Sequence, residues 1–275
     1  MKKYIYTFIL LALTFSFTSC EEVIDVNLDT APPRLVIDAA LKWEKGTDGS
    51  LQKIKLTTTT SYFNTEIPKV SGATVFVTNS NQDQFDFIEI NPNSGEYMCT
   101  NFIPIMNETY ALTVILNGTT YMATEKLMPV PAIDKIEQKA NGGFGGENIE
   151  IKFFYTDNPL TDDFYLSRSK LSSYAIPQYG VSTDKFYQGN QTSDIYSDED
   201  LKPGKTLDYS LSGISEGYFN YLQVLLSIAG NSGGGPFQSP PATVRGNIVN
   251  QTNHDNYALG FFSVSETTSV IYTIN

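Results

Sequence analysis

Histidine and cysteine are almost absent from this chain. Its 275 residues include one histidine, His254, and two cysteines, Cys20 and Cys99. A Ser-His-Asp or Cys-His catalytic site needs a histidine beside its nucleophile, and a zinc site needs several His or Cys ligands. The composition therefore argues against an enzyme of these classes, and we expect no catalytic residue, no metal ligand and no cofactor. His254 stands in a polar segment that is typical of a solvated loop.

Basic residues are also few. Lys and Arg number 18 against 30 Asp and Glu, so the formal net charge is −12. Nucleic-acid binding relies on lysine and arginine contacts to phosphates, and this balance argues against a nucleic-acid partner. We attribute the acidity to solubility. Beyond the N-terminal segment, no apolar run approaches the roughly 20 residues of a membrane-spanning helix.

The N-terminal segment has the parts of a secretory signal. Two lysines precede an apolar run over residues 4–17, and small residues follow before Cys20. This order predicts a signal peptide over residues 1–19. Two interpretations remain open. The cysteine is incidental to an ordinary signal, or it is the lipid attachment site of a bacterial lipoprotein, anchored to a membrane without spanning it.

We favour the lipoprotein interpretation. Residues 17–20, Phe-Thr-Ser-Cys, resemble a lipobox, with Phe where Leu is usual. The polar, acidic residues 20–33 then form a tether that ends in Ala-Pro-Pro. If Cys20 carries lipid, Cys99 has no cysteine for an intramolecular disulfide. Cys99 lies in an apparent strand and is interpreted as a buried structural thiol.

Short alternating segments at roughly ten-residue spacing predict a β-sandwich over residues 34–130. The clearest hairpin covers residues 110–124, where Asn117-Gly118 supplies the positive φ pair of a type I′ turn. Pro129-Val130-Pro131 then interrupts the pattern, because proline cannot extend a central strand. We therefore place a domain boundary there.

Residues 131–275 predict a second, more irregular β-rich domain with one prominent α-helix. Ser215 is suited to cap this helix, apolar residues follow at helical spacing, and Gly230 is suited to end it. A final β region is expected over residues 258–273. The fold class is therefore mainly β with one helix.

Two features of the second half are candidates for binding. Carboxylates are dense in residues 157–163 and 194–200, and calcium favours such ligands, although neither stretch has the EF-hand pattern and solvated turns are the favoured interpretation. Aromatic side chains of the loop between Tyr174 and Tyr196 are suited to contact a ligand or partner, or else they plug a long irregular connection. The aromatic candidates are Tyr174, Tyr179, Phe186, Tyr187 and Tyr196.

Three stretches together resemble a known family. The first is Tyr-Ala-Leu-Thr-Val at residues 110–114, followed by Gly118, residues 121–123 and residues 129–131. The second is residues 236–241 with Arg-Gly-Asn-Ile at residues 245–248, and the third is Ala-Leu-Gly-Phe-Phe-Ser at residues 258–263. With the N-terminal cysteine they resemble the DUF4249 lipoproteins of Bacteroidetes over nearly the whole chain. The resemblance implies an Ig-like N-terminal β domain and association with SusC-type TonB-dependent outer-membrane transporters. It implies no catalytic residues.

The resemblance also implies roles for residues that follow Cys20. Glu21 and Glu22 resemble the acidic signal that exports lipoproteins of this phylum to the cell surface, and Thr30 resembles an O-glycosylation site. We therefore expect a surface-exposed outer-membrane lipoprotein that assists a transporter barrel without being an enzyme. Two alternatives remain: a lipoprotein that binds a glycan or peptide unaided, and a structural or biogenesis subunit of an outer-membrane complex.

Overall fold

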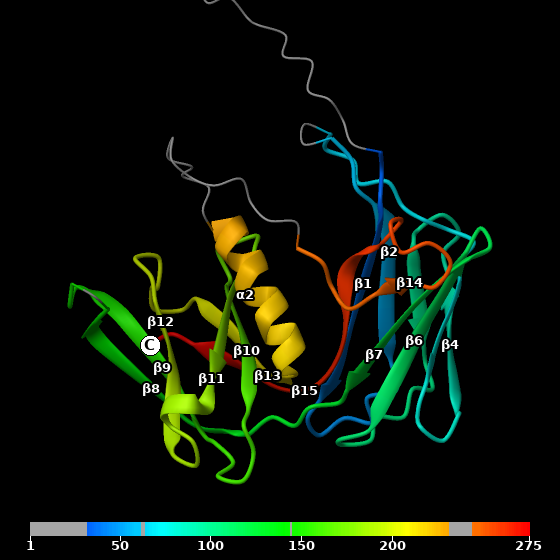
Figure 1. Ribbon diagram of the computed structural model, residues 1–275. Helices are drawn as coiled ribbons and strands as arrows, with labels where there is room; N and C mark the ends of the chain where they lie inside the picture. Colours follow the sequence, from blue (N-terminus) through cyan, green and yellow to red (C-terminus); the bar gives the residue numbers. More distant parts are fainter. Residues whose placement is uncertain (1–31, 62–63, 144, 231–243) are drawn as a thin grey trace, which may run out of the picture. The chain divides into compact units, whose positions relative to one another are not determined.

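The computed structural model describes residues 32–61, 64–143, 145–230 and 244–275. The chain divides into Met1–Pro32 and a compact unit, Pro33–Asn275, which holds every described strand and helix (Figure 1). None of the described helices is long and apolar enough to cross a membrane. The predicted signal peptide and four predicted sites lie outside the described residues. These sites are Cys20, Glu21, Glu22 and Thr30.

The described unit is mainly β, with one long helix, as predicted. The strands are β1 (Leu35–Glu44), β2 (Gln52–Thr58), β3 (Thr74–Thr78), β4 (Gln84–Glu89), β5 (Glu96–Cys99), β6 (Thr109–Leu116), β7 (Thr119–Lys126), β8 (Ile133–Gly142), β9 (Asn148–Thr156), β10 (Phe164–Leu171), β11 (Gln178–Thr183), β12 (Gln191–Ser197), β13 (Thr206–Ile214), β14 (Val249–Asn250) and β15 (Leu259–Thr273). A short 3₁₀ helix, η1, covers Asp184–Phe186, and α2 covers Glu216–Gly230.

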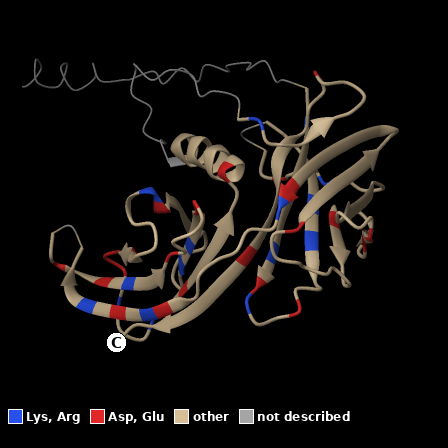
Figure 2. Cartoon of the chain, turned by 60° about the horizontal axis from the view of Figure 1, so that its bottom comes forward, with Lys and Arg blue, Asp and Glu red and all other residues tan. Residues whose placement is uncertain are grey.

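The strands form two sheets. The large mixed sheet has the order β11-β10-β13-β15-β1-β2-β5-β4-β3-β6-β7-β14, and the small sheet has the order β12-β9-β8. β1 and β15 run parallel, whereas the other ladders are antiparallel. Basic and acidic residues alternate along several strands in the view of Figure 2 and do not separate into one basic and one acidic region.

Local sequence explains the first half of the fold. Along β1, Ile37, Ala39 and Leu41 are buried while the alternate side chains Asp38 and Lys42 face solvent, because successive side chains of a strand point to opposite faces. The β6–β7 hairpin turns at Asn117-Gly118, with φ of 50° and 77°. Both values lie in the left-handed region that the predicted type I′ turn requires, so this prediction is confirmed.

β15 joins the two halves of the chain. Its first part pairs with β1 in parallel, from Leu259 opposite Val36 to Thr267 opposite Glu44. Its second part pairs with β13, ending with Thr273 opposite Thr206. The final β region was expected in this place along the chain, but its pairing with the first strand was not expected. A single 15-residue strand therefore carries the large sheet across both halves.

The buried apolar residues form separate clusters. One cluster contains Ile37, Leu112 and other residues of β1–β7, together with Phe262 of β15. A second cluster lies between the small sheet and the strands β10 and β13, where Phe153 and Tyr209 stack with ring centroids 3.9 Å apart. The clusters divide near Val130, close to the expected domain boundary, but β15 contributes to both. The boundaries of the two expected domains stay a prediction.

One prediction about the second half is wrong. A long irregular connection was one alternative for the segment between Tyr174 and Tyr196, but this segment contains β11, η1 and most of β12. These strands lack a simple alternation of buried and exposed residues, since four of the six β11 residues are half-buried. Their pairing with β10 and β9 forms them, and such a pairing is not visible in a local pattern.

Candidate functional site

The helix α2 is held at its N-terminus by its cap. The Tyr218 N–H donates to the Ser215 hydroxyl at 3.1 Å, which confirms the predicted cap. The same hydroxyl donates to the Glu125 carboxylate at 2.9 Å, so the helix start is tied to β7. Burial raises the pKa of Glu125. The partial positive charge of the helix N-terminus favours a carboxylate in this position.

Aromatic and aliphatic side chains pack the first half of α2 against the large sheet. Tyr218 and Tyr221 pack on Phe261 of β15, with ring centroids 4.7 and 5.1 Å away. Phe219 and Leu222 are buried against the strands β10 and β13. The second half of α2 is less covered, and Leu225 remains 37% exposed.

A groove of about 690 Å³ opens beside this exposed half of α2. We call it the α2 groove. One wall is formed by leucines of α2 and by Leu166 and Tyr179, and the other wall by the outward face of β1 and β2. Pockets that hold small ligands range over roughly 300–1,000 Å³, so the groove has a suitable size. Its lining residues are Asp38, Ala40, Lys42, Leu51, Gln52, Lys53, Lys55, Glu96, Leu166, Tyr179, Ser212, Tyr218, Leu222, Leu225, Leu226, Ser263 and Ser265.

A smaller cavity of about 180 Å³ lies among β9–β13. The Tyr209 hydroxyl donates to the Asp194 carboxylate at 2.7 Å, and burial raises the pKa of this carboxyl. The Tyr196 side chain also lines the cavity, and its hydroxyl is the one buried side-chain polar atom without a hydrogen-bond partner in the described parts of the chain. Burial raises the pKa of Tyr196 to about 12. The cavity has room for ordered water rather than for a large ligand.

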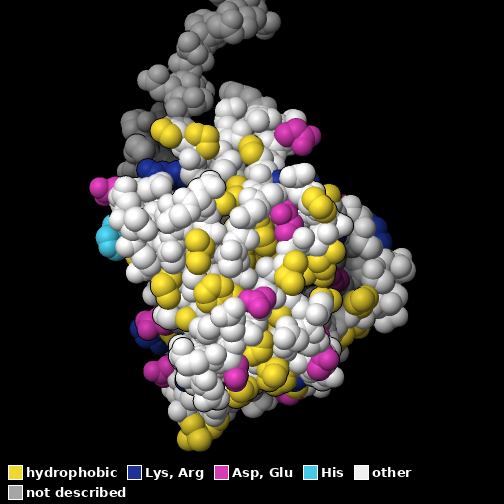
Figure 3. Space-filling view, turned by 90° about the vertical axis from the view of Figure 1, so that its right-hand side faces the viewer, with side chains coloured by type: hydrophobic (Ala, Val, Ile, Leu, Met, Phe, Trp, Pro, Cys, Tyr) yellow, Lys and Arg dark blue, Asp and Glu magenta, His cyan; other side chains and the backbone are white. Residues whose placement is uncertain are grey.

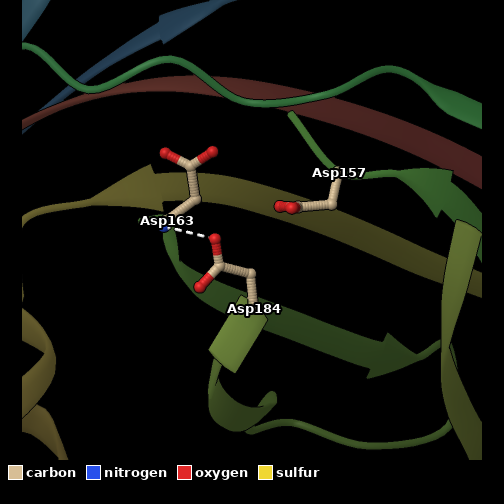
Figure 4. A group of neighbouring side chains, drawn as sticks. All are labelled: Asp157, Asp163 and Asp184. Carbon is tan, nitrogen blue, oxygen red and sulfur yellow. Dashed lines mark hydrogen bonds between the residues drawn. The ribbon is translucent and has the colours of Figure 1, made fainter. Parts of the chain in front are cut away.

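Three buried carboxylates meet at the end of β9, as Figure 4 shows. Asp157 and Asp163 belong to the acidic stretch noted in the sequence, and Asp184 of η1 joins them. Oxygen atoms of the three lie within 4.8 Å of one another, a spacing that a metal ion could bridge. Internal donors already serve these oxygens, however. The Gly189 N–H donates to Asp157 at 2.9 Å, and the Asp163 N–H donates to Asp184 at 2.7 Å.

The second acidic stretch is not gathered in this way. Asp194 faces the interior beside Tyr209, whereas Asp198 accepts hydrogen bonds from the Tyr174 hydroxyl at 2.7 Å and from the Asp200 N–H at 2.9 Å. The contacts of Asp198 are those of an ordinary turn. The sequence alone could not separate the two stretches, because Asp184 lies more than twenty residues from Asp163 and no spacing rule connects them.

The five aromatic candidates do not share one surface. Phe186 and Tyr179 are 90% and 47% exposed, and only Tyr179 of the five lines the α2 groove. Tyr196 is buried, and Tyr187 packs against the second cluster with its hydroxyl 3.4 Å from that of Tyr155. Tyr174 is half-buried. A role of these residues in ligand or partner contact stays a prediction.

The two residues that suggested chemistry by type have ordinary surroundings. Cys99 is buried in β5, as predicted, and burial raises the pKa of its thiol. A raised pKa disfavours the reactive thiolate. His254 is exposed in the loop between β14 and β15. The groove, rather than these side chains, is the most developed candidate site of the described unit.

The comparisons with known proteins decide the family. The model of the family "Domain of unknown function (DUF4249)" matches residues 21–271. The chain belongs to the DUF4249 family. No curated protein matches the chain.

The solved structures that match are only distantly similar. A two-domain fibronectin type III segment of chicken tenascin is 12% identical, with 80% of this chain and 91% of that chain covered and a TM-score of 0.24. A DUF4785 family protein from Legionella pneumophila is 9% identical, with 64% and 51% covered and a TM-score of 0.27. The FN1–FN3 domains of chicken CNTN1 are 13% identical, with 68% and 63% covered and a TM-score of 0.23. Scores this low do not establish a shared fold.

The DUF4249 stretches that the structure describes have structural roles. Asn247 bridges the backbone of β15: its side-chain amide donates to the Phe262 carbonyl, and its carbonyl accepts from the Phe262 N–H, both at 2.9 Å. A Cβ on Gly246 would lie 1.7 Å from the Gly260 carbonyl oxygen, so this crossing requires glycine. The guanidinium of Arg245 stacks 3.9 Å from the centre of the Tyr257 ring. These residues dock the segment before β14 onto β15.

Proposed function

We propose that this chain is an outer-membrane lipoprotein, exposed at the cell surface of a Bacteroidetes bacterium, that captures a ligand for a SusC-like TonB-dependent transporter. The observation that carries the capture role is the α2 groove, an open site of about 690 Å³ with both leucines and lysines among its lining residues. Cys20 after a signal-like segment supports the lipid anchor, and Glu21 and Glu22 support surface export. Membership of DUF4249 supports the transporter partner.

The strand order supports the Ig-like character of the first half. The strands β1-β2-β5-β4 and β3-β6-β7 follow one another in the large sheet. Lettered in chain order they become A-B-E-D and C-F-G, which are the two layers of a constant-type immunoglobulin domain.

Hydrophobic side chains are scattered among polar atoms on the face shown in Figure 3. This arrangement favours a module that supports the groove rather than one large apolar docking face.

The partner is tested by affinity purification of the full chain from detergent-solubilised outer membranes. We expect a transporter barrel to co-purify in a stable ratio. A Cys20→Ala variant should leave the membrane fraction, and replacing Glu21 and Glu22 by Ala should protect the protein from proteinase K on intact cells. Recovery of the lipidated chain without a barrel would contradict the transporter role.

Exposed aromatic side chains favour one second candidate, a lipoprotein that binds a glycan or peptide unaided. Phe186 is 90% exposed on η1, and exposed aromatic rings are common in such contacts. Calorimetric titration with glycans and peptides distinguishes this candidate. Binding that disappears in a Phe186→Ala variant, in a protein that purifies without a barrel, would support it.

A further inference from the structure

Leucines supply most of the apolar lining of the α2 groove, beside Tyr179 and Tyr218. Leu222 is buried on the sheet side of α2, and Leu225, one turn further, is 37% exposed. Leu51 is 61% exposed and lines the same groove from the segment before β2. Leu225 and Leu51 therefore expose aliphatic surface to solvent within one groove. Covering such surface contributes about 25 cal/mol per Å² of apolar area, so an aliphatic ligand would be stabilised there.

The opposite wall is basic because of strand alternation. Lys42 of β1 and Lys53 and Lys55 of β2 alternate with buried residues and therefore share the outward face of the sheet. Lys53 pairs with Glu96 at 3.4 Å. Among the described residues, no carboxylate oxygen lies within 4.0 Å of the amino group of Lys42 or Lys55. Asp38, which lies opposite Lys55 in the β1–β2 pairing, and Glu96 also line the groove, so three lysines face two carboxylates there. Lys42 and Lys55 are the two of these lysines whose amino groups are not held in an ion pair within the described residues.

The pKa of the Lys42 amino group is lowered by its surroundings. Desolvation by the surrounding protein lowers the pKa of Lys42, and the positive charge of Arg168 lowers it further, while the negative charges of Asp38 and Glu44 partly offset this shift. The side chain is nevertheless exposed, because the groove is open and water reaches it. The guanidinium of Arg168 is paired with Asp208 at 2.8 Å, whereas Lys42 has no such partner within the described unit. An anion placed beside Lys42 would favour its charged form.

We propose that the α2 groove binds an amphipathic anion, with an aliphatic chain along the leucines of α2 and a carboxylate beside Lys42 and Lys55. This inference rests on the proposed function and names the class of ligand that the groove captures. Two aromatic rings line the groove, Tyr179 and Tyr218, and Tyr218 is already packed on Phe261, so leucines supply most of the open apolar surface and favour an aliphatic chain over a sugar. A short carboxylate without a chain would leave the apolar wall uncovered.

The test is calorimetric titration of residues 20–275 carrying Cys20→Ser, without the predicted signal peptide, so that neither the expected lipid nor the apolar N-terminal run requires detergent. Dodecanoate is the probe, acetate supplies the head without the chain, and dodecanol supplies the chain without the charge. We expect saturable binding of dodecanoate and no measurable binding of acetate. Dodecanol should bind about tenfold or more weakly, which is the ratio for one charge-assisted contact of roughly 1.5 kcal/mol.

Matched variants locate the site. Lys42→Gln with Lys55→Gln should weaken dodecanoate binding by about tenfold or more, and Leu225→Ser should weaken it by a similar factor through lost apolar contact. Lys139→Gln on the edge strand β8 and Ile195→Ser on β12 are controls, since both side chains are exposed away from the groove. The controls should bind as the parent does, and the melting temperature of each variant checks its folding.

The outcomes separate this inference from the proposed function. A folded chain that does not bind dodecanoate, or that binds dodecanol as tightly, overturns the inference even if a barrel co-purifies. Equal binding by the lysine variants and the parent also overturns it. Groove-dependent binding of dodecanoate supports it even if no barrel is recovered, in which case the transporter role fails alone.

Discussion

Replacing Asn247 by Ala tests whether this single side chain holds the segment before β14 against β15. Its amide makes two hydrogen bonds to the backbone of Phe262, both of 2.9 Å. Each such bond contributes about 1 kcal/mol net, so Asn247→Ala should lower the free energy of unfolding by about 2 kcal/mol. For a chain of this size, 1 kcal/mol corresponds to roughly 2–4 °C, and the melting temperature should fall by roughly 4–8 °C.

The assay is thermal unfolding followed by circular dichroism, with urea unfolding for the free energy. Asn247→Asp provides a second perturbation of the same contact. It keeps an oxygen to accept from the Phe262 N–H but places a second oxygen against the Phe262 carbonyl. At neutral pH it should therefore destabilise at least as much as alanine. Below pH about 3.9 the protonated carboxyl can donate again, so the difference from the parent chain should narrow.

Gln251→Ala is the matched control, because this exposed amide makes one hydrogen bond of 3.3 Å, to the Val249 carbonyl. We expect its effect to remain within about 0.5 kcal/mol. If Asn247→Ala changes stability no more than this control, the bridging role is refuted. The same holds if Asn247→Asp is more stable than Asn247→Ala at neutral pH.

Two further predictions concern β12 and β15. Burial raises the pKa of Asp194, so its ionisation opposes folding, and the contribution of this residue to stability should fall as pH rises from about 4 through its folded-state pKa. Asp194→Asn still accepts from Tyr209, so in melts across pH it should be more stable than the parent at pH 7 and lose this advantage below about pH 4; an equal advantage at every pH would contradict the burial argument. Gly260 has φ of 102°, and a Cβ there would lie 2.0 Å from the Ile37 carbonyl oxygen, so Gly260→Ala should destabilise by about 3 kcal/mol or more in urea unfolding. Gly46→Ala is the control, because Gly46 also has a positive φ, 87°, but a Cβ there would meet no atom within 4 Å. Only the cost of the left-handed backbone, about 1 kcal/mol, is therefore expected for Gly46→Ala. An equal loss of unfolding free energy in the two variants would contradict the predicted clash at Gly260.

Local patterns predicted the elements whose stability is local. The turn at Asn117-Gly118 needs only two residues with positive φ, and both are where the sequence suggests. The cap of α2 at Ser215 needs one hydroxyl within a turn of the helix start, and it is present. The buried thiol of Cys99 follows from strand alternation. Each of these predictions depends on residues a few positions apart.

The features that local patterns did not indicate depend on long-range pairing. β11 and β12 formed where an irregular connection was considered, because β10 and β9 offer them partners. Tyr196 was a candidate for ligand contact by residue type, and its burial is set by the packing of the small sheet on β13. Asp184 joins Asp157 and Asp163 through the position of η1, which no spacing rule indicates.

The order of residues along the chain was sufficient for the mainly β character, the prominent helix, the turn and the cap, since each arises from side-chain periodicity or from contacts within one turn. The folded chain alone revealed the parallel pairing of β15 with β1, residues more than two hundred positions apart, and the groove that this pairing creates beside α2. Strand alternation indicates which side chains share a face, but it does not indicate which strand lies alongside. The position of Lys42 and Lys55 opposite the leucines of α2 therefore became visible only when the large sheet was assembled.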